Sequence, residues 1–370
     1  MKVSSVDVTP VSLSLPEPAF DATARWDRFN FLMVNVETSD GLVGMSDIAP
    51  LHGKEAPIYE SIIKKKLEGL VVGEEPYDLE RLWLKMVGKG SGAYALGSKG
   101  AIVSAVSAID VALWDIVSKS FGTPLYNLLG GKFRDRVKLY VSFMGDIPID
   151  RIKYFLDQGF KAVKIKLGFD LEKDVNKIIE IRDALGYGFD LMVDINQGYD
   201  LRQAIAFTSK AEKYEVYWVE EPINVYNFKA LKILSEKTRI PIGLGENYYG
   251  KDEFFNVLEG DIAGVIQPDV NHAGGLTPIR KIVSLASFLD TPVAPHLHSI
   301  IGFAVGLHIL TSVPNGLIAE YVIYGKRWKE RDEALKSLVS VDDGYAKLRC
   351  KEGIGVEPDK LLEVFKESPV

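Results

Sequence analysis

Ionisable residues recur at a nearly constant interval through the second half of the chain, each after an apolar segment. They are Lys166, Asp194, Glu220, Glu246, Asp269, His296 and Glu320. The intervals between them are 28, 26, 26, 23, 27 and 24 positions. One strand, one helix and two short loops require about this length, and a buried barrel strand that ends in an ionisable group delivers that group to the rim. The spacing therefore predicts a β/α barrel together with its functional edge.

Strand and helix patterns alternate from Val137 onward, as expected for a parallel sheet in an α/β fold. The apolar segments predict eight strands, at residues 137–141, 162–167, 191–195, 216–219, 241–245, 264–267, 292–294 and 317–319. Amphipathic segments such as 171–185 separate them. Eight strands suit a closed, TIM-like barrel.

The first part of the chain has a different pattern. Residues 3–15 and 29–37 alternate as antiparallel strands, and helical spacing follows at 57–70, 79–86 and 101–118, the last with one apolar face. We expect an α+β domain over residues 1–125, a barrel over 126–325, and a C-terminal segment, 326–370, that packs back on the first domain. The 370 residues leave about 120 beyond the roughly 250 of a single barrel.

Composition excludes several classes of protein. The net charge of −7 gives no basic surface for nucleic acid. Cys350 is the only cysteine, which rules out an internal disulfide, argues against a thiolate metal site and indicates a reducing compartment. The N-terminus lacks the pattern of a signal peptide, and no uninterrupted apolar run approaches the roughly 18 residues of a membrane span. We therefore expect a cytoplasmic protein with no membrane partner.

Three carboxylates, Asp194, Glu220 and Glu246, end successive predicted strands and are expected to share one ion. A site of oxygen ligands without Cys or a suitably placed His favours Mg²⁺ over Zn²⁺. A single carboxylate there could equally be salt-bridged or solvated. Asn196 points to the same face as Asp194 if the strand continues, and either binds the ligand or caps the loop.

Lys164 and Lys166 leave their strand on the same face because they are two residues apart. If they are buried side by side, each disfavours the charge of the other, which lowers the amine pKa and makes a general base available near neutral pH. The alternative is a pair of surface lysines on an edge strand.

Asp269 and His296 end the sixth and seventh predicted strands. A carboxylate that accepts the Nδ1 hydrogen fixes the imidazole tautomer and leaves Nε2 for a substrate. Glu320, after the eighth strand, is either a protonated acid that donates to an oxyanion, with its pKa raised by burial, or the ion-pair partner of a lysine. His298 is a candidate for a supporting role, and His308 is interpreted as a core residue.

Taken together, these residues resemble the enolase superfamily and, within it, the mandelate racemase group. The resemblance covers nearly the whole chain. Its motifs are Lys164-Ile165-Lys166, Asp194-Ile195-Asn196, Trp218-Val219-Glu220-Glu221-Pro222, Gly245-Glu246-Asn247, Pro268-Asp269 with Gly274-Gly275, His296-Leu297 and Glu320. Muconate-lactonising and dipeptide-epimerase relatives are expected to have a lysine where this chain has Asp269.

The resemblance implies a modified (β/α)₇β barrel with an N-terminal α+β capping domain, and Mg²⁺ on the three carboxylates. It also implies that a base removes the proton α to a substrate carboxylate and that an enediolate intermediate forms, as in other members of the superfamily. Lys166 and His296 are expected to act on opposite faces of the substrate, with Lys164 and Glu320 stabilising the intermediate. Homo-oligomers, dimers or octamers, are a further expectation from the resemblance.

The function expected first is dehydration of a sugar acid, an aldonate or aldarate, to a 2-keto-3-deoxy acid, because resembling proteins with this Lys/His pair mostly perform dehydrations. Racemisation or epimerisation of a 2-hydroxy acid is the alternative. A purely structural role would require a degraded site, and every expected position is filled. Polar residues of two N-terminal loops could cover a polyol or simply be solvated: Asp21, Arg25, Trp26, Asp27, Arg28, His52 and Lys54.

Overall fold

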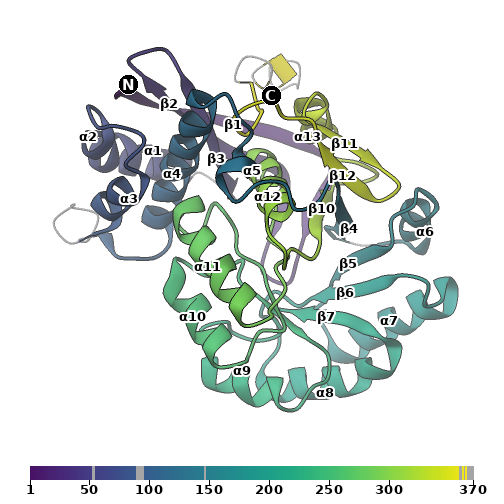
Figure 1. Cartoon of the computed structure of the whole chain (residues 1–370). Coiled ribbons are helices and arrows are strands. Elements are labelled where there is room, and N and C mark those ends of the chain that lie inside the picture. Colours follow the sequence, from purple (N-terminus) through teal and green to yellow (C-terminus); the bar gives the residue numbers. More distant parts are fainter. Residues whose placement is uncertain (52–54, 89–95, 146, 358–360, 362, 365–370) are drawn as a thin grey trace.

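The computed structural model describes residues 1–370 except 52–54, 89–95, 146, 358–360, 362 and 365–370. It contains a three-stranded antiparallel sheet in the N-terminal domain and a nine-stranded sheet, of which seven strands form the barrel and two belong to the C-terminal segment (Figure 1). The N-terminal domain lies beside the barrel, and the C-terminal segment lies over both. The predicted class, an α/β barrel with an α+β cap, is confirmed.

In the N-terminal domain the sheet has the order β1-β2-β3 and packs against helices. The strands are β1 (Val3–Phe20), β2 (Arg25–Thr38) and β3 (Val43–Leu51). The helices are α1 (Ala56–Ile62), the π-helical turn η1 (Ile63–Leu67), α2 (Glu68–Val71), α3 (Leu79–Val87), α4 (Ala101–Ser120) and α5 (Leu125–Leu128). The β1–β2 hairpin is longer than predicted. An Asp21 carboxylate oxygen closes its tip by accepting the N–H groups of Thr23 (2.7 Å) and Ala24 (2.9 Å).

Helix α4 is the central helix of this domain. The predicted apolar face packs in one core cluster of this domain, with Ala105, Ile109 and Ala112 among its members. The helix is buried on its other sides as well, because every residue from Ile102 to Ser118 is buried. The helix packs against β2 and β3 on one side and contacts α11 of the barrel on another, so no face remains for solvent. By length and composition alone it could cross a membrane, but 94% of its apolar window is buried inside the protein. Its apolar character is that of an interdomain core helix.

The barrel follows the expected alternation of strand and helix. Its strands are β4 (Val137–Phe143), β5 (Ala162–Lys166), β6 (Asp190–Asp194), β7 (Val216–Glu220), β8 (Ile242–Leu244), β9 (Val265–Ile266) and β10 (Ala319–Ile323). Its helices are α6 (Ile149–Asp157), α7 (Leu171–Leu185), α8 (Leu201–Ala211), α9 (Phe228–Ser235), α10 (Lys251–Glu259), α11 (Leu276–Phe288) and α12 (Ile300–Ser312), with a 3₁₀ turn, η3 (Glu212–Tyr214), after α8. Neighbouring barrel strands pair in parallel, and β10 closes the barrel against β4.

Two predicted strands differ from the structure. The segment 292–294 forms only two isolated bridges, both at Val293, one to Ile266 and one to Gly316. Pro292 and Pro295 flank it, and proline has no N–H with which to extend a ladder. The last strand starts two residues later than predicted, so Glu320 is its second residue and lies inside the barrel instead of at the strand end.

A layer of side chains fills the interior of the barrel below the rim. It contains Tyr140, Ala162, Met192, Trp218, Val265, Ala294 and Ile318. Strand β8 contributes Gly243 at the level of Trp218, where an added Cβ would collide with the side-chain oxygen of Gln267. The missing side chain makes room for Trp218 and Gln267 to reach the rim from below.

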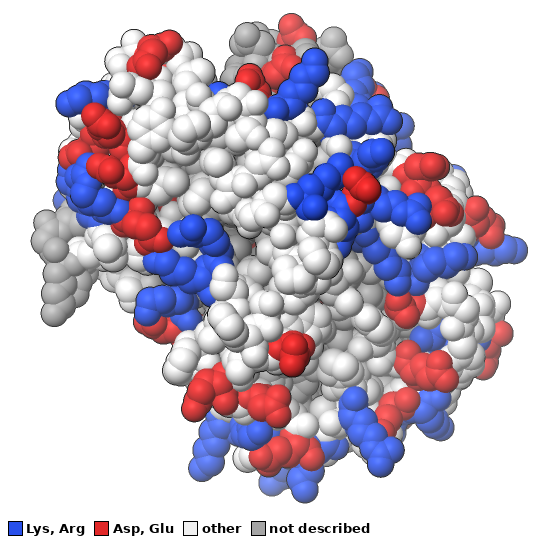
Figure 2. Space-filling model, viewed as in Figure 1, with Lys and Arg blue, Asp and Glu red and all other residues white. Residues whose placement is uncertain are grey.

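The C-terminal segment contacts both other parts of the chain. It comprises α13 (Lys329–Leu335), β11 (Val339–Asp342) and β12 (Tyr345–Leu348). Strand β12 pairs with β4 of the barrel, whereas Trp328 packs edge-on against Phe29 of β2 at 4.6 Å between ring centroids. The predicted packing on the capping domain is therefore accompanied by pairing with the barrel, and the domain boundaries stay a prediction. On the face shown in Figure 2, basic and acidic side chains are interspersed.

The close approach of β3 to α4 predicts a strong effect of Gly44→Ala. The added methyl group would collide with the carbonyl oxygen of Ala112 and lie 2.8 Å from Ile116 Cγ1. Overpacking of this kind should lower the free energy of unfolding by about 1–3 kcal/mol, measured by urea denaturation. Gly69→Ala is the control, because no atom lies within 4 Å of its added methyl group; it should be neutral or stabilising. Equal effects of the two substitutions would contradict the prediction.

Candidate active site

A cavity of about 170 Å³ lies where the barrel mouth meets the tip of the β1–β2 hairpin. It is lined by Asp21, Thr23, Trp26, Lys166, Asn196, Gln197, Glu246, Asn247, His272, His296 and His298. A larger cavity of about 320 Å³ lies beside α11 and α12, but Arg280 is the one charged residue among those that line it. The smaller cavity therefore contains the groups with acid–base chemistry.

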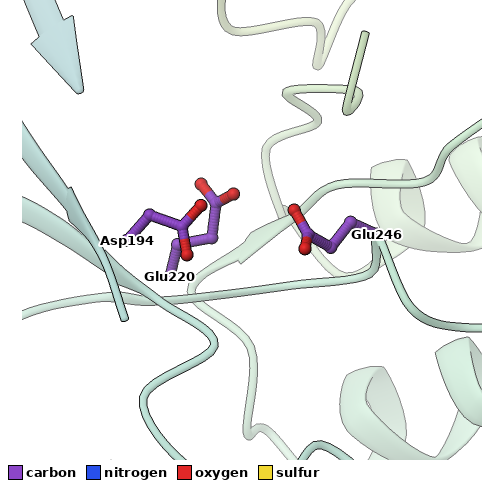
Figure 3. Close-up of side chains that lie close together, drawn as sticks. All are labelled: Asp194, Glu220 and Glu246. Atoms are coloured by element: carbon purple, nitrogen blue, oxygen red, sulfur yellow. The ribbon is translucent and has the colours of Figure 1, made fainter. Parts of the chain in front are cut away.

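Three carboxylates meet at the mouth of the barrel, and one of them, Glu246, lines this cavity. Asp194 ends β6, Glu220 ends β7, and Glu246 follows β8 by two residues. One oxygen atom from each lies within 4.8 Å of the others. Figure 3 shows Asp194 and Glu220 side by side, with the carboxylate of Glu246 turned toward them. Parallel strands end at one edge of the sheet, which is why residues 26 positions apart converge.

The donor set of this trio fits Mg²⁺. It consists of carboxylate oxygens, the hard ligands that Mg²⁺ prefers. Glu246 Oε2 is buried without a hydrogen-bond partner among the described residues. Burial, together with the adjacent Asp194, raises the pKa of Glu220 to about 8. A divalent cation between the carboxylates would relieve both the unsatisfied oxygen of Glu246 and the mutual repulsion of the trio.

Strand β7 and the loop after β9 hold Glu220 in place. Its Oε2 accepts hydrogen bonds from Gln267 Nε2 at 2.6 Å and from Trp218 Nε1 at 3.2 Å. Trp218 belongs to the layer below the rim, and the absence of a side chain at Gly243 leaves room for both donors. The sequence analysis missed Gln267 as a site residue, although it stands directly before Pro268-Asp269 in a recognised motif.

Lys164 and Lys166 are buried on one face of β5, as predicted. The prediction that the pKa values of these two lysines are lowered is wrong. Burial does oppose their charged forms, but Glu220 and Glu320 beside Lys164, and Asp194 beside Lys166, outweigh it and raise both pKa values. The contacts are short: Lys164 Nζ lies 2.6 Å from Glu220 Oε1, and Lys166 Nζ lies 2.6 Å from Asp194 Oδ2.

Glu320 faces Lys164 across the barrel. Its Oε1 lies 2.9 Å from Lys164 Nζ, and its Oε2 accepts the backbone N–H of Leu297 at 3.1 Å. Burial favours the neutral acid, but the charges of Lys164 and His296 outweigh it and lower the pKa of Glu320. The expectation of a raised pKa is therefore wrong, and the alternative interpretation, an ion-pair partner of a lysine, describes the structure.

The predicted His–Asp pair is present. His296 Nδ1 donates to Asp269 Oδ2 at 2.6 Å, and His296 Nε2 lies 3.5 Å from Glu246 Oε2 at the cavity. Burial opposes the imidazolium, but Glu246 and the bond to Asp269 outweigh it and raise the pKa of His296 to about 10. The pair therefore holds a proton on the side of the cavity that adjoins the carboxylate trio.

The predicted substrate-contacting residues have different outcomes. Strand β6 ends at Asp194, so Asn196 reaches the cavity through a left-handed turn with φ of 43° instead of strand alternation, and donates to Glu246 Oε1 at 3.2 Å. Trp26 is buried and lines the cavity, whereas Arg25 is exposed and is not among its lining residues. His52 lies outside the described residues.

His272 and His298 also line the cavity. His272 was missed in the sequence analysis, although it lies in the loop between Asp269 and the Gly-Gly pair; its Nδ1 is 2.9 Å from the carbonyl oxygen of Glu246. His298 Nε2 lies 2.8 Å from the hydroxyl of Tyr324, in keeping with a supporting role. His308 is a core residue, as predicted, and its burial lowers its pKa to about 4.

Comparison with protein families finds matches over both domains. Residues 5–130 match the mandelate racemase/muconate lactonizing enzyme N-terminal domain, and residues 149–362 match the enolase C-terminal domain-like family. A D-galactonate dehydratase from Xanthomonas oryzae pv. oryzae (strain PXO99A) is 32% identical over 369 residues, which cover 95% of this chain and 93% of that protein. A D-xylonate dehydratase from Haloferax volcanii is 30% identical over 360 residues, covering 90% and 84%.

Solved structures share the fold along the whole chain. A racemase from Streptomyces coelicolor A3(2) with bound magnesium has a TM-score of 0.86 at 27% identity and covers 100% of both chains. L-Talarate dehydratase from Polaromonas sp. JS666, complexed with Mg and L-glucarate, has a TM-score of 0.84 at 26% identity and covers 96% of this chain and 95% of that one.

The carboxylates around His296 predict that its proton affinity depends on metal. The pKa of about 10 exceeds the ordinary 6.5, so His296 adds stability that is complete below pH 6.5 and is lost as pH rises through 10. Mg²⁺ should lower this pKa, because Glu246 contributes most to raising it. NMR titration of the imidazole proton shifts from pH 5 to 11 measures the pKa of His296 with and without Mg²⁺. The variant His296→Asn assigns the resonance. A midpoint unchanged by Mg²⁺ would count against a metal site beside His296.

Proposed function

The chain belongs to the mandelate racemase/muconate lactonizing enzyme family of the enolase superfamily, and we propose that it dehydrates a sugar acid to a 2-keto-3-deoxy acid. The observation that carries this proposal is His296, which is paired with Asp269 and lines the same cavity as Lys166 and Glu246 of the carboxylate trio. The curated relatives named above are dehydratases of aldonic acids, D-galactonate and D-xylonate. An aldonate or an aldarate is the proposed substrate class.

In this proposal, Asp194, Glu220 and Glu246 hold Mg²⁺. When bound, the cation neutralises the substrate carboxylate and so makes the α-proton more acidic. Lys164 adds a fixed positive charge at the same place, held by its 2.9 Å contact with Glu320. A carbon acid α to a carboxylate is much weaker than the conjugate acid of any side-chain base, so this charge stabilisation accounts for most of the barrier lowering.

Lys166 is the proposed base that removes the α-proton. Its Nζ must be neutral to accept a proton, and the ion pair with Asp194 at present favours the ammonium form. Lys166 becomes a better base when another positive charge interacts with Asp194. The charge of Asp194 is the largest of the influences that raise the pKa of Lys166, and this influence is then weaker.

His296 is the proposed acid. Its proton at Nε2 passes to the β-hydroxyl, the C–O bond breaks, and water leaves. Asp269 keeps the ring in the required orientation and stabilises the imidazolium before the transfer. One proton is taken by Lys166 and one is given by His296, so the remaining enol needs only tautomerisation to become the 2-keto-3-deoxy acid.

Polar groups elsewhere in the cavity suit the hydroxyl groups of a sugar chain. Thr23 and Asp21 at the hairpin tip face Gln197, Asn247 and His272 from the barrel across the same cavity. Side chains that both donate and accept are what a polyol requires. A cytoplasmic location and a homo-oligomer, dimer or octamer, stay predictions.

Racemisation or epimerisation of a 2-hydroxy acid is the second candidate. It needs a base on each face of the α-carbon but no leaving group, and Lys166 and His296 both line the cavity. One of the structural neighbours is a racemase. Unconsumed substrate incubated in D₂O distinguishes the two reactions, since a racemase places deuterium in both configurations whereas a dehydratase accumulates keto acid.

A panel of aldonates and aldarates tests the proposal directly. With Mg²⁺ present, at least one should yield a 2-keto acid, detected as its semicarbazone, and EDTA should abolish the signal. The matched control is Glu246→Gln, which removes charge from the trio and should weaken Mg²⁺ binding measured by calorimetry. Absence of keto acid across the panel, with deuterium in both configurations of a 2-hydroxy acid, would favour racemisation instead.

Substitution of the His–Asp pair should separate catalysis from metal binding. His296→Asn and Asp269→Asn should each lower kcat for dehydration by roughly 10²- to 10⁴-fold, the usual contribution of a positioned acid or base. Both variants should still bind Mg²⁺, because neither residue belongs to the trio. Near-parental turnover of either variant would remove His296 from the mechanism.

A further inference from the structure

A chain of buried hydrogen bonds joins the N-terminal domain to the His296–Asp269 pair. It begins at Asp47 on β3, which is 1% exposed. Asp47 Oδ1 accepts the hydroxyl hydrogen of Ser299 at 2.8 Å, and Oδ2 accepts the backbone N–H of Ile301 at 2.9 Å. Both donors belong to the first turn of α12, directly after His296 and His298 in the sequence.

The chain continues from Ser299 to the loop after β9. Asn271 Nδ2 donates to Ser299 Oγ at 3.0 Å, and the backbone N–H of Asn271 donates to Asp269 Oδ1 at 2.6 Å. Asp269 Oδ2 is thereby left for His296 Nδ1. Each of these residues is buried, so water does not compete for the bonds.

The hydroxyl of Ser299 gives this chain a direction. It has one hydrogen and two lone pairs, and all three are used: it donates to Asp47 and accepts from Asn271 and from the N–H of Gly302. A carboxylate can only accept, so Asp47 determines where the Ser299 hydrogen points. Burial raises the pKa of Asp47 to about 6, which leaves it ionised at neutral pH.

Asn271 depends on this direction. Its Oδ1 is buried and has no hydrogen-bond partner in the part of the chain that the structure describes. The amide is therefore oriented through Nδ2, which requires Ser299 Oγ to be an acceptor. The backbone N–H that reaches Asp269 belongs to the same residue.

We propose that Asp47 is a positioning residue of the proposed catalytic pair: through Ser299 and Asn271 it orients Asp269, and hence the imidazole of His296. Because Asp47 belongs to the N-terminal domain, the pair is complete only when that domain is docked on the barrel. The consequence for dehydration rests on the proposed function, but the effect on the orientation of His296 does not.

Asp110 provides a matched control. It lies on α4 of the same domain, is also 1% exposed, and accepts a hydroxyl hydrogen and a backbone N–H from a barrel helix. Both come from Thr277 in α11, with Oγ1 at 2.6 Å and N at 2.9 Å. From Thr277 the bonds lead to Trp114 Nε1 at 3.0 Å instead of to the His–Asp pair.

Asp47→Asn and Asp110→Asn test the proposal. An amide offers one acceptor oxygen where each carboxylate supplies two, so both variants should lose thermal stability to a similar degree. Only Asp47→Asn should shift or broaden the low-field proton resonance of His296 Nδ1–H, assigned by its loss in His296→Asn. It should also lower kcat by roughly 10- to 100-fold with little change in KM, whereas Asp110→Asn keeps near-parental turnover.

An unchanged His296 resonance in folded Asp47→Asn, or an equal loss of turnover in both variants, overturns the proposal. If Asp47→Asn does not fold, Ser299→Ala is used in its place. This variant removes the connecting hydroxyl and leaves the hydrogen bond from Ile301 to Asp47. The same change in the His296 resonance is expected, and an unchanged resonance would also overturn the proposal. The resonance is recorded without substrate. A shifted resonance in a protein that dehydrates no sugar acid would therefore refute the proposed function and still support the positioning role.

Discussion

The mouth of the barrel buries more carboxyl groups than amino groups, and the rest of the site depends on how this imbalance is compensated. Asp194, Glu220 and Glu320 are fully buried, and two lysines from one strand share them. An uncompensated buried charge costs several kcal/mol, so neither lysine can be removed without cost. A divalent cation among the trio would complete the compensation and release the lysines from their present partners. Metal binding and base strength are thus linked by the same charges.

The barrel provides the geometry that this compensation requires. Parallel strands end at one rim and bring residues about 26 positions apart within 4.8 Å. Glu220 is supported from beneath, since Trp218 of the interior layer and Gln267 after β9 both donate to it through the space left by Gly243. A rigid interior is therefore part of the site, because it holds carboxylates together that would otherwise repel one another.

The N-terminal domain completes the site from the other side. The tip of the β1–β2 hairpin places Asp21 and Trp26 against the cavity, and β3 places Asp47 against the first turn of α12. Asp110 makes an equivalent bond to α11. Two buried carboxylates thus cross the same domain interface and accept N–H groups at the starts of two barrel helices, positions where negative charge is favoured. The contacts that dock the domain and the contacts that complete the site therefore involve neighbouring residues.

The sequence by itself determined the barrel, the order of its strands and the identity of the rim residues, because burial on both faces makes each strand apolar and the change to an ionisable residue marks its end. It failed where local backbone features interrupted the strand pattern. The two prolines beside Val293 left isolated bridges in place of a strand, and Asn196 entered the cavity through a turn. Tertiary structure alone decided the protonation of Lys166 and Glu320, because a pKa depends on which charges lie within a few ångströms, and those charges come from other strands.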